Sequence, residues 1–108
     1  MDKERIIVGT ANFGVRYGLN KIRLQYKEVN QISQILNKNK IHVYDTAQSY
    51  GKSEKIIGKL KVKKKVYTKL VIKKTNNQRL EKIIDKLIKA SLKNLNTSQI
   101  EGIYIHNV

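Results

Sequence analysis

The 108-residue sequence predicts an α/β protein whose strands run parallel in one sheet. Short apolar runs rich in β-branched residues alternate with longer segments of helical periodicity, which gives the order β-α-β-α-β-α-β. A helix separates each strand from the next, and a right-handed helical crossover returns the chain in the same direction. The composition, 40% hydrophobic and 29% charged, is that of an ordinary globular chain. Together these observations favour a single domain with a parallel sheet.

Four apolar runs are expected to form the strands, at residues 5–8, 41–45, 65–69 and 102–106. Three helices are expected between them, at residues 26–39, 53–60 and 80–95. The last of these has the clearest three- and four-residue apolar spacing, and Ser53 is a candidate cap for the second. The same order of elements occurs in open doubly wound sheets and in closed eight-stranded barrels. The alternation alone leaves both architectures open.

The formal net charge is +15, from 23 Lys and Arg against 8 Asp and Glu. Such an excess can serve a polyanionic partner such as nucleic acid. However, the lysines are scattered along the chain, and only 6% of the residues are aromatic, which leaves few rings for base stacking. The densest basic run, residues 61–65, falls between two predicted elements, where charges are usually solvated. We therefore expect a solvated basic surface rather than a nucleic-acid interface.

The sequence contains no cysteine, so it offers no disulfide, thiol nucleophile or thiolate metal site, and no metal is expected. No segment reads as a signal peptide or approaches the length of a membrane span. A cytoplasmic protein without a membrane partner is the expectation.

Ionisable residues end three successive predicted strands: Asp45 the second, Lys69 the third and His106 the fourth. Tyr50 follows in the loop five positions after Asp45, and Gly51 permits a tight turn there. Active sites of parallel α/β folds lie at the carboxyl ends of the strands. Each residue taken singly is more often structural, but the joint pattern indicates a site.

The chemistry available to such a cluster is proton transfer. A free tyrosine, with a pKa near ~10, is a poor acid at neutral pH. A neighbouring lysine cation favours the phenolate, and a carboxylate holds that lysine charged and in place. A histidine can orient a carbonyl group. The cluster suits proton delivery to a carbonyl oxygen or removal from an alcohol, and a nicotinamide would supply the missing redox equivalent.

The segment 45–51, Asp-Thr-Ala-Gln-Ser-Tyr-Gly, resembles the D-T-A-x-x-Y-G signature of the aldo/keto reductases. Further segments resemble this family and occur in the family's order: residues 9–14 upstream, and residues 57–60, 66–69, 91–95 and 103–106 downstream. The stretch 14–18 resembles a bacterial subgroup linked to surface-polysaccharide metabolism. The resemblance covers essentially the whole chain.

The resemblance implies a (β/α)8 TIM barrel and NAD(P)H-dependent reduction of aldehydes or ketones, including sugar-related carbonyls. It implies that Tyr50 is the general acid, that Lys69 lowers its pKa, that Asp45 pairs with Lys69 and that His106 orients the substrate carbonyl. It also implies that Gly9, Thr10 and Asp45 approach the nicotinamide end of NADPH or, less often, NADH.

The chain of 108 residues is too short to form a complete barrel. A barrel of this type needs about 250 residues, and its phosphate-binding loops follow strands seven and eight. We therefore expect residues 1–108 to be the N-terminal half of such a barrel, with four strands and three helices and without the C-terminal half. Without the phosphate-binding loops, the chain alone is expected to bind NAD(P)H poorly and to be active only when it is completed. The first and fourth strands would be open edges beside an uncovered sheet face, which favours self-association or pairing with a second half-barrel. Two alternatives remain: a non-catalytic half-barrel interaction module and a basic nucleic-acid-binding domain.

Overall fold

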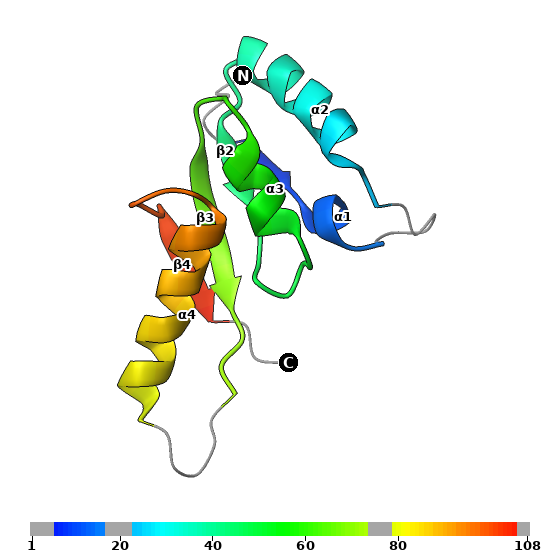
Figure 1. Cartoon of the computed structure of the whole chain (residues 1–108). Helices are drawn as coiled ribbons and strands as arrows, with labels where there is room; N and C mark the ends of the chain where they lie inside the picture. Colours follow the sequence, from blue (N-terminus) through cyan, green and yellow to red (C-terminus); the bar gives the residue numbers. More distant parts are fainter. Residues whose placement is uncertain (1–5, 17–22, 74–78, 106–108) are drawn as a thin grey trace.

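A computed structural model of the chain describes residues 6–16, 23–73 and 79–105 (Figure 1). Its strands are β1 (Ile7–Gly9), β2 (Val43–Asp45), β3 (Lys65–Leu70) and β4 (Gly102–Ile105). Its helices are α1 (Ala11–Gly14), α2 (Tyr26–Lys38), α3 (Ser53–Lys59) and α4 (Leu80–Asn94). The predicted alternation of strands and helices is therefore confirmed within the described residues.

The four strands form one sheet in the order β1-β2-β3-β4, and every neighbouring pair is parallel. In the ladders, Val8 lies beside Tyr44, Tyr44 beside Val66, and Thr68 beside Ile103. The carboxyl ends of all four strands consequently meet at one edge of the sheet, and their amino ends meet at the other. β1 and β4 are the outer strands, as expected from the sequence.

Helix α1 was not expected from the sequence. It has four residues and begins directly after Thr10, whereas apolar periodicity needs two turns or more to become visible. Helices α2, α3 and α4 match the expected segments to within one residue at each end. The expected fourth strand extended to His106, which lies outside the described residues; β4 is described up to Ile105.

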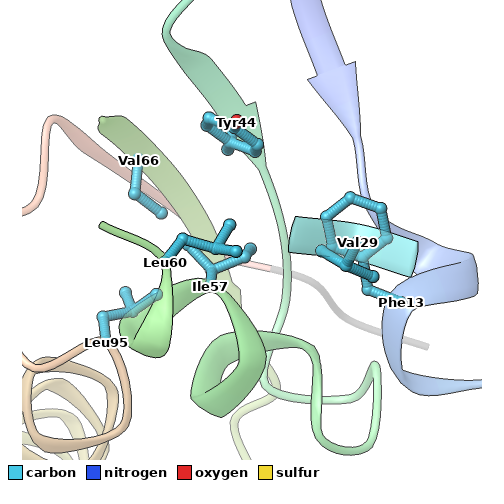
Figure 2. Close-up of a cluster of buried hydrophobic side chains, with 7 residues drawn as sticks. All are labelled: Phe13, Val29, Tyr44, Ile57, Leu60, Val66 and Leu95. Carbon is cyan, nitrogen blue, oxygen red and sulfur yellow. The ribbon is translucent and has the colours of Figure 1, made fainter. Parts of the chain in front are cut away.

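The hydrophobic core fills the space between the sheet and the helices (Figure 2). Its buried members are Phe13, Val29, Tyr44, Ile57, Leu60, Val66 and Leu95. The two inner strands contribute Tyr44 from β2 and Val66 from β3, because apolar side chains on one face of the sheet are buried against the helices. In Figure 1, α4 lies in front of β4, and its last turn brings Leu95 to the core.

The opposite face of the sheet is not covered by any described helix. Side chains alternate along β3, so Val66, Thr68 and Leu70 are buried under the helices, while Tyr67 and Lys69 are only half-buried on the other face. On the outer strands, Ile7 and Tyr104 of that face are 56% and 54% exposed. We call this the open face. No described helix is long and apolar enough to cross a membrane.

Candidate active site

Asp45 and Lys69 meet at the carboxyl ends of β2 and β3. Asp45 is the last residue of β2 and pairs in register with Tyr67. Lys69 is two residues beyond Tyr67 and therefore points to the same face. Its Nζ donates a hydrogen bond to Asp45 Oδ2 at 2.9 Å, which also makes an ion pair. Parallel pairing thus converts a separation of 24 residues in sequence into direct contact.

Tyr50 joins this pair from the loop between β2 and α3. Lys69 Nζ donates to the phenol oxygen of Tyr50 at 3.4 Å and lies 5.1 Å from the centre of its ring. A single ammonium group therefore contacts both the carboxylate of Asp45 and the phenol of Tyr50. Such a group stabilises negative charge on either partner.

The environment of Lys69 keeps it protonated. Partial burial lowers the pKa of the ammonium, but the hydrogen bonds to Asp45 and Tyr50 and the charges of both groups outweigh this and raise the pKa of Lys69 above its ordinary value. The lysine is therefore a cation throughout the neutral range.

Two glycines fix the loop that carries Tyr50. Gly51 has a φ of +58°, in the left-handed region that side chains other than glycine rarely adopt. Gly14, at the end of α1, lies so close to the loop that a Cβ at this position would collide with the carbonyl oxygen of Tyr50. The close packing of α1 on the loop restricts where the phenol can lie.

The buried hydroxyl groups of Thr10, Thr46 and Ser53 form a cluster that contacts the two ends of the same loop. Ser53 Oγ lies 2.9 Å from Thr10 Oγ1 and 2.8 Å from Thr46 Oγ1. Thr10 Oγ1 also donates to the main-chain oxygen of Asp45 at 2.9 Å. The interpretation of Ser53 as a helix cap was wrong: Lys52 is the N-cap of α3, and the Ser53 hydroxyl is used in this cluster instead.

Gln48 ties the loop to β3 and to α4. Its main-chain N–H donates to the carbonyl of Lys69 at 3.1 Å, and its Nε2 donates to Leu87 O and to Ser91 Oγ, both at 2.7 Å. Sequence reasoning assigned Gln48 no role, although its position between Thr46 and Tyr50 could have indicated that it helps to hold the Tyr50 loop.

Glu54 is a second residue that sequence reasoning missed. It is almost fully buried, and its two carboxylate oxygens accept hydrogen bonds from Thr68 Oγ1 at 2.8 Å and from Asn94 Nδ2 at 3.2 Å. These bonds join α3 to β3 and to the end of α4. Buried carboxylates need such donors. Glu54 therefore fixes the position of α3, the helix that follows the Tyr50 loop, relative to β3 and α4.

Two cavities adjoin the Asp45–Lys69 pair. One, of about 340 Å³, is bordered by Gly9, Thr10, Asp45 and Tyr50. Nothing lies within 4 Å of the place where a Cβ on Gly9 would stand, so a ligand can approach the main chain there. Thr10 itself has no exposed surface, because its hydroxyl faces the buried cluster.

The second cavity, of about 210 Å³, lies on the open face. Asp45 and Lys69 border it together with Ile7, Tyr67 and Tyr104. The Tyr67 and Tyr104 rings lie 6.3 Å apart, centre to centre, so this cavity has an aromatic wall.

Of the sequence-predicted site residues, the structure brings Asp45, Tyr50 and Lys69 together and places Gly9 and Thr10 beside them. His106 lies outside the described residues. Among residues 6–16, 23–73 and 79–105 there is no group of three His, Cys, Asp or Glu side chains that could hold a metal ion.

Parallel strands, helices on one sheet face and a Lys–Asp–Tyr cluster at the carboxyl edge define a part of a barrel-type α/β protein. The chain belongs to the aldo/keto reductase family, whose sequence model matches residues 5–108. A search of curated proteins gives no significant match.

Several solved structures share the fold, among them two that are each described as a "putative aldo-keto reductase" from Pseudomonas aeruginosa. One aligns with a TM-score of 0.73 at 24% identity, and the other with 0.71 at 23%. Each alignment covers 93% of this chain and 40% of the other chain. This chain therefore spans about 40% of the length of these relatives, and its four strands form a partial TIM barrel.

Proposed function

We propose that this chain supplies the proton-transfer part of an aldo/keto reductase site that reduces aldehydes or ketones with NADPH or NADH. The observation that carries the proposal is the position of Lys69, whose ammonium contacts both the Asp45 carboxylate and the Tyr50 phenol. Family membership over residues 5–108 supports the same reaction class.

In this proposal Tyr50 donates a proton to the oxygen of the substrate carbonyl as that oxygen becomes negative. Lys69 stabilises the charge left on the phenol oxygen, because its ammonium already donates to that atom. Asp45 holds Lys69 in place and keeps it charged. His106 is proposed to orient the carbonyl from the chain segment after β4.

The residues around Tyr50 fit a nicotinamide cofactor. Such a cofactor supplies hydride chemistry when it is bound. The open space at Gly9 permits a close approach to the main chain, and Asp45 borders the same cavity. Thr10 would contribute indirectly, since its hydroxyl holds the main chain of Asp45.

The substrate in this proposal is a small carbonyl compound that reaches Tyr50 and Lys69 at the carboxyl edge of the sheet and enters the cavity that Asp45 and Lys69 border. Tyr67 and Tyr104 give this approach an aromatic wall, on which the C–H faces of a sugar can pack. Sugar-related aldehydes and ketones are therefore the first class to test. Of the stretch 14–18 that suggested this class, Tyr17 and Gly18 lie outside the described residues.

The open face also supports a proposal about assembly. Ile7 and Tyr104 expose apolar surface, and the outer strands β1 and β4 have unpaired edges within the described chain. We propose that a second half-barrel, either another copy or a separate chain, covers this face. Sedimentation over a range of concentrations tests self-association, and Ile7→Lys should weaken it; a monomer at every concentration contradicts it.

The reductase proposal is tested by the loss of NADPH absorbance with a panel of aldehydes and ketones. Tyr50→Phe removes only the phenol hydroxyl, so turnover should fall about 10²–10⁴-fold, the usual contribution of a positioned acid. Tyr26→Phe is the matched control, because the Tyr26 hydroxyl makes only an exposed contact with Lys59 O. Because the chain supplies only the proton-transfer part of the site, turnover is measured after assembly with a second half-barrel, and turnover that survives Tyr50→Phe contradicts the proposal.

A further inference from the structure

We propose that the amino-terminal end of the sheet carries a second site, separate from Tyr50, that binds a compact phosphate-bearing anion. A cavity of about 180 Å³ opens there. Lys40, His42, Lys63 and Lys65 line it, with Glu101 as the acidic member of the lining. We call these five residues the amino-end cluster.

Parallel pairing of β2 and β3 assembles this cluster from separate segments. Val43, the first residue of β2, lies beside Lys65, the first residue of β3. The main-chain N–H of Lys65 donates to His42 O at 2.8 Å. The chain preceding β2, with Lys40, and the chain preceding β3, with Lys63, are consequently held side by side.

The cluster has an excess of positive charge. Its three lysines face one carboxylate, Glu101, and within the described chain none of the three has an ion-pair partner within 4 Å. Lys69 at the other end of β3 has such a partner in Asp45. An anion that enters the cavity would therefore find ammonium donors not already engaged by carboxylates of the described chain.

His42 adds an unused polar atom. Its Nδ1 is buried and has no hydrogen-bond partner among the described residues. Buried polar atoms of this kind are uncommon, and functional sites are one place where they occur. Within the described chain, His42 Nδ1 is therefore available for a hydrogen bond to a ligand.

The backbone at Lys40 provides an independent observation. Lys40 has a φ of +60°, in the left-handed region, and directly follows Asn39, the C-cap of α2. The corresponding position after α4 is Asn96, with a φ of +52°, and asparagine is one of the few residues that tolerate this conformation well. A lysine is disfavoured there, and residues held in such backbone regions cluster at functional sites.

The size and chemistry of the cavity indicate the class of ligand. It is smaller than the roughly 300–1,000 Å³ of pockets that enclose drug-sized molecules. Several ammonium groups around a small volume suit a chain of phosphate groups. A free oligophosphate and the phosphate tail of a nucleotide share this chemistry, and the experiment below distinguishes them.

The amino-end cluster is distinct from the candidate active site. Lys65 and Lys69 are four residues apart on the same face of β3, a separation of about 13 Å at 3.3 Å per residue. Tyr67 lies between them and borders the cavities at both ends. The proposal therefore does not depend on reductase activity and needs no cofactor for its test.

The test is calorimetric titration of inorganic tripolyphosphate into the full chain at about 0.15 M salt, where long-range attraction is screened. The site variant carries Lys40→Gln, Lys63→Gln and Lys65→Gln. The control variant carries Lys82→Gln, Lys86→Gln and Lys93→Gln, three exposed positions on α4. Both variants lose three positive charges, so a general effect of net charge weakens binding equally in the two.

We expect saturable binding that falls about tenfold or more in the site variant and less than about threefold in the control, since each exposed ion pair contributes only modestly. Equal weakening of both variants, or no saturable binding by the unaltered chain, overturns the proposal. Titration with ATP then separates the two sources. Equal affinity for ATP and tripolyphosphate identifies the phosphates as the whole ligand, and tighter ATP binding identifies a nucleotide.

Lys40→Asn is a second variant that guards against a folding defect. It removes one charge from the amino-end cluster and places in the left-handed position the residue that the chain uses after α4. Binding of tripolyphosphate should weaken while the thermal midpoint stays equal or rises. Unchanged binding in this variant contradicts a role for Lys40.

Discussion

The two ends of strand β3 use the same side chain differently. Lys69, near the carboxyl end, is held between Asp45 and Tyr50, whereas Lys65, at the amino end, borders a cavity with Lys40 and Lys63. Both lysines point to the open face of the sheet. The difference shows that charge alone does not define a site: the partners that the neighbouring strands and loops bring into contact decide the chemistry.

The surroundings of the two ends differ in rigidity as well as in charge. At the carboxyl end, Gly14, Gly51 and the hydroxyl cluster of Thr10, Thr46 and Ser53 fix the loop that carries Tyr50. An acid that must reach a carbonyl oxygen benefits from such fixed placement. At the amino end, Lys40, Lys63 and Lys65 are exposed, which suits binding of an anion rather than proton transfer.

The largest expected effect comes from a matched pair of substitutions in β3. Lys69→Met should lower NADPH-dependent turnover by about 10²-fold or more, because the charge on the Tyr50 oxygen loses its ammonium partner. Lys65→Met, on the same face of the same strand, should leave turnover nearly unchanged. Steady-state rates of both variants measure the contrast, and equal losses would remove the distinction between the two ends.

A smaller effect is expected from crowding the Tyr50 loop. Gly14→Ala should destabilise the fold by about 1–3 kcal/mol, because the added methyl group collides with the Tyr50 carbonyl. Gly9→Ala, where a Cβ meets nothing within 4 Å, should change stability by no more than about 1 kcal/mol. Urea unfolding measures both; similar values for the two would show that α1 does not restrain the loop.

At the amino end the expected change is a gain in stability. Lys40→Asn should raise the free energy of unfolding by about 1 kcal/mol, because asparagine tolerates the left-handed backbone better. The reciprocal change Asn96→Lys should lower it by a similar amount. A loss of stability in Lys40→Asn, seen in the same urea experiment, would mean that Lys40 stabilises the fold.

The smallest expected effect is a pH dependence of the free energy of unfolding, caused by the Lys69–Asp45 ion pair at the carboxyl end of β3. The pKa of Lys69 is raised in the folded chain, so its contribution is fully present below the ordinary lysine value of 10.5 and is lost as the pH rises through the higher folded value. Asp45→Asn removes the charge that helps to raise this pKa. The unaltered chain should be the more stable of the two at neutral pH, and the difference should shrink above pH 10.5. A constant difference across that range would show that the ion pair is not its source.

The sequence predicted the parts of the fold that depend on periodicity. The apolar spacing in residues 80–95 and the β-branched run before Lys69 correspond to α4 and β3. The short helix α1 could not be predicted in this way, because four residues show no period. The actual role of Ser53 was also hidden, because a serine before a helix is usually a cap, and only the fold brings Thr10 and Thr46 to it.

The two ends of the sheet also differ in how visible they were in the sequence. Asp45 and Tyr50 lie in one continuous motif, and Lys69 ends an apolar run, so the carboxyl-end cluster could be proposed before the structure was known. Lys40 and Lys63 belong to different loops within a chain of net charge +15, so their proximity could not be separated from the general excess of lysine. Pairing of β2 with β3 is what brings them together.

The central claim is that the carboxyl end, not the basic amino end, receives the nicotinamide cofactor. Because NADPH also carries phosphates, its fluorescence should be titrated with the variant Lys40→Gln, Lys63→Gln, Lys65→Gln and, separately, with Gly9→Leu, which fills the open space beside Asp45. We predict saturable binding that survives in the lysine variant and at raised salt but is lost in Gly9→Leu. Binding that disappears with the three lysines and persists in Gly9→Leu would contradict the claim.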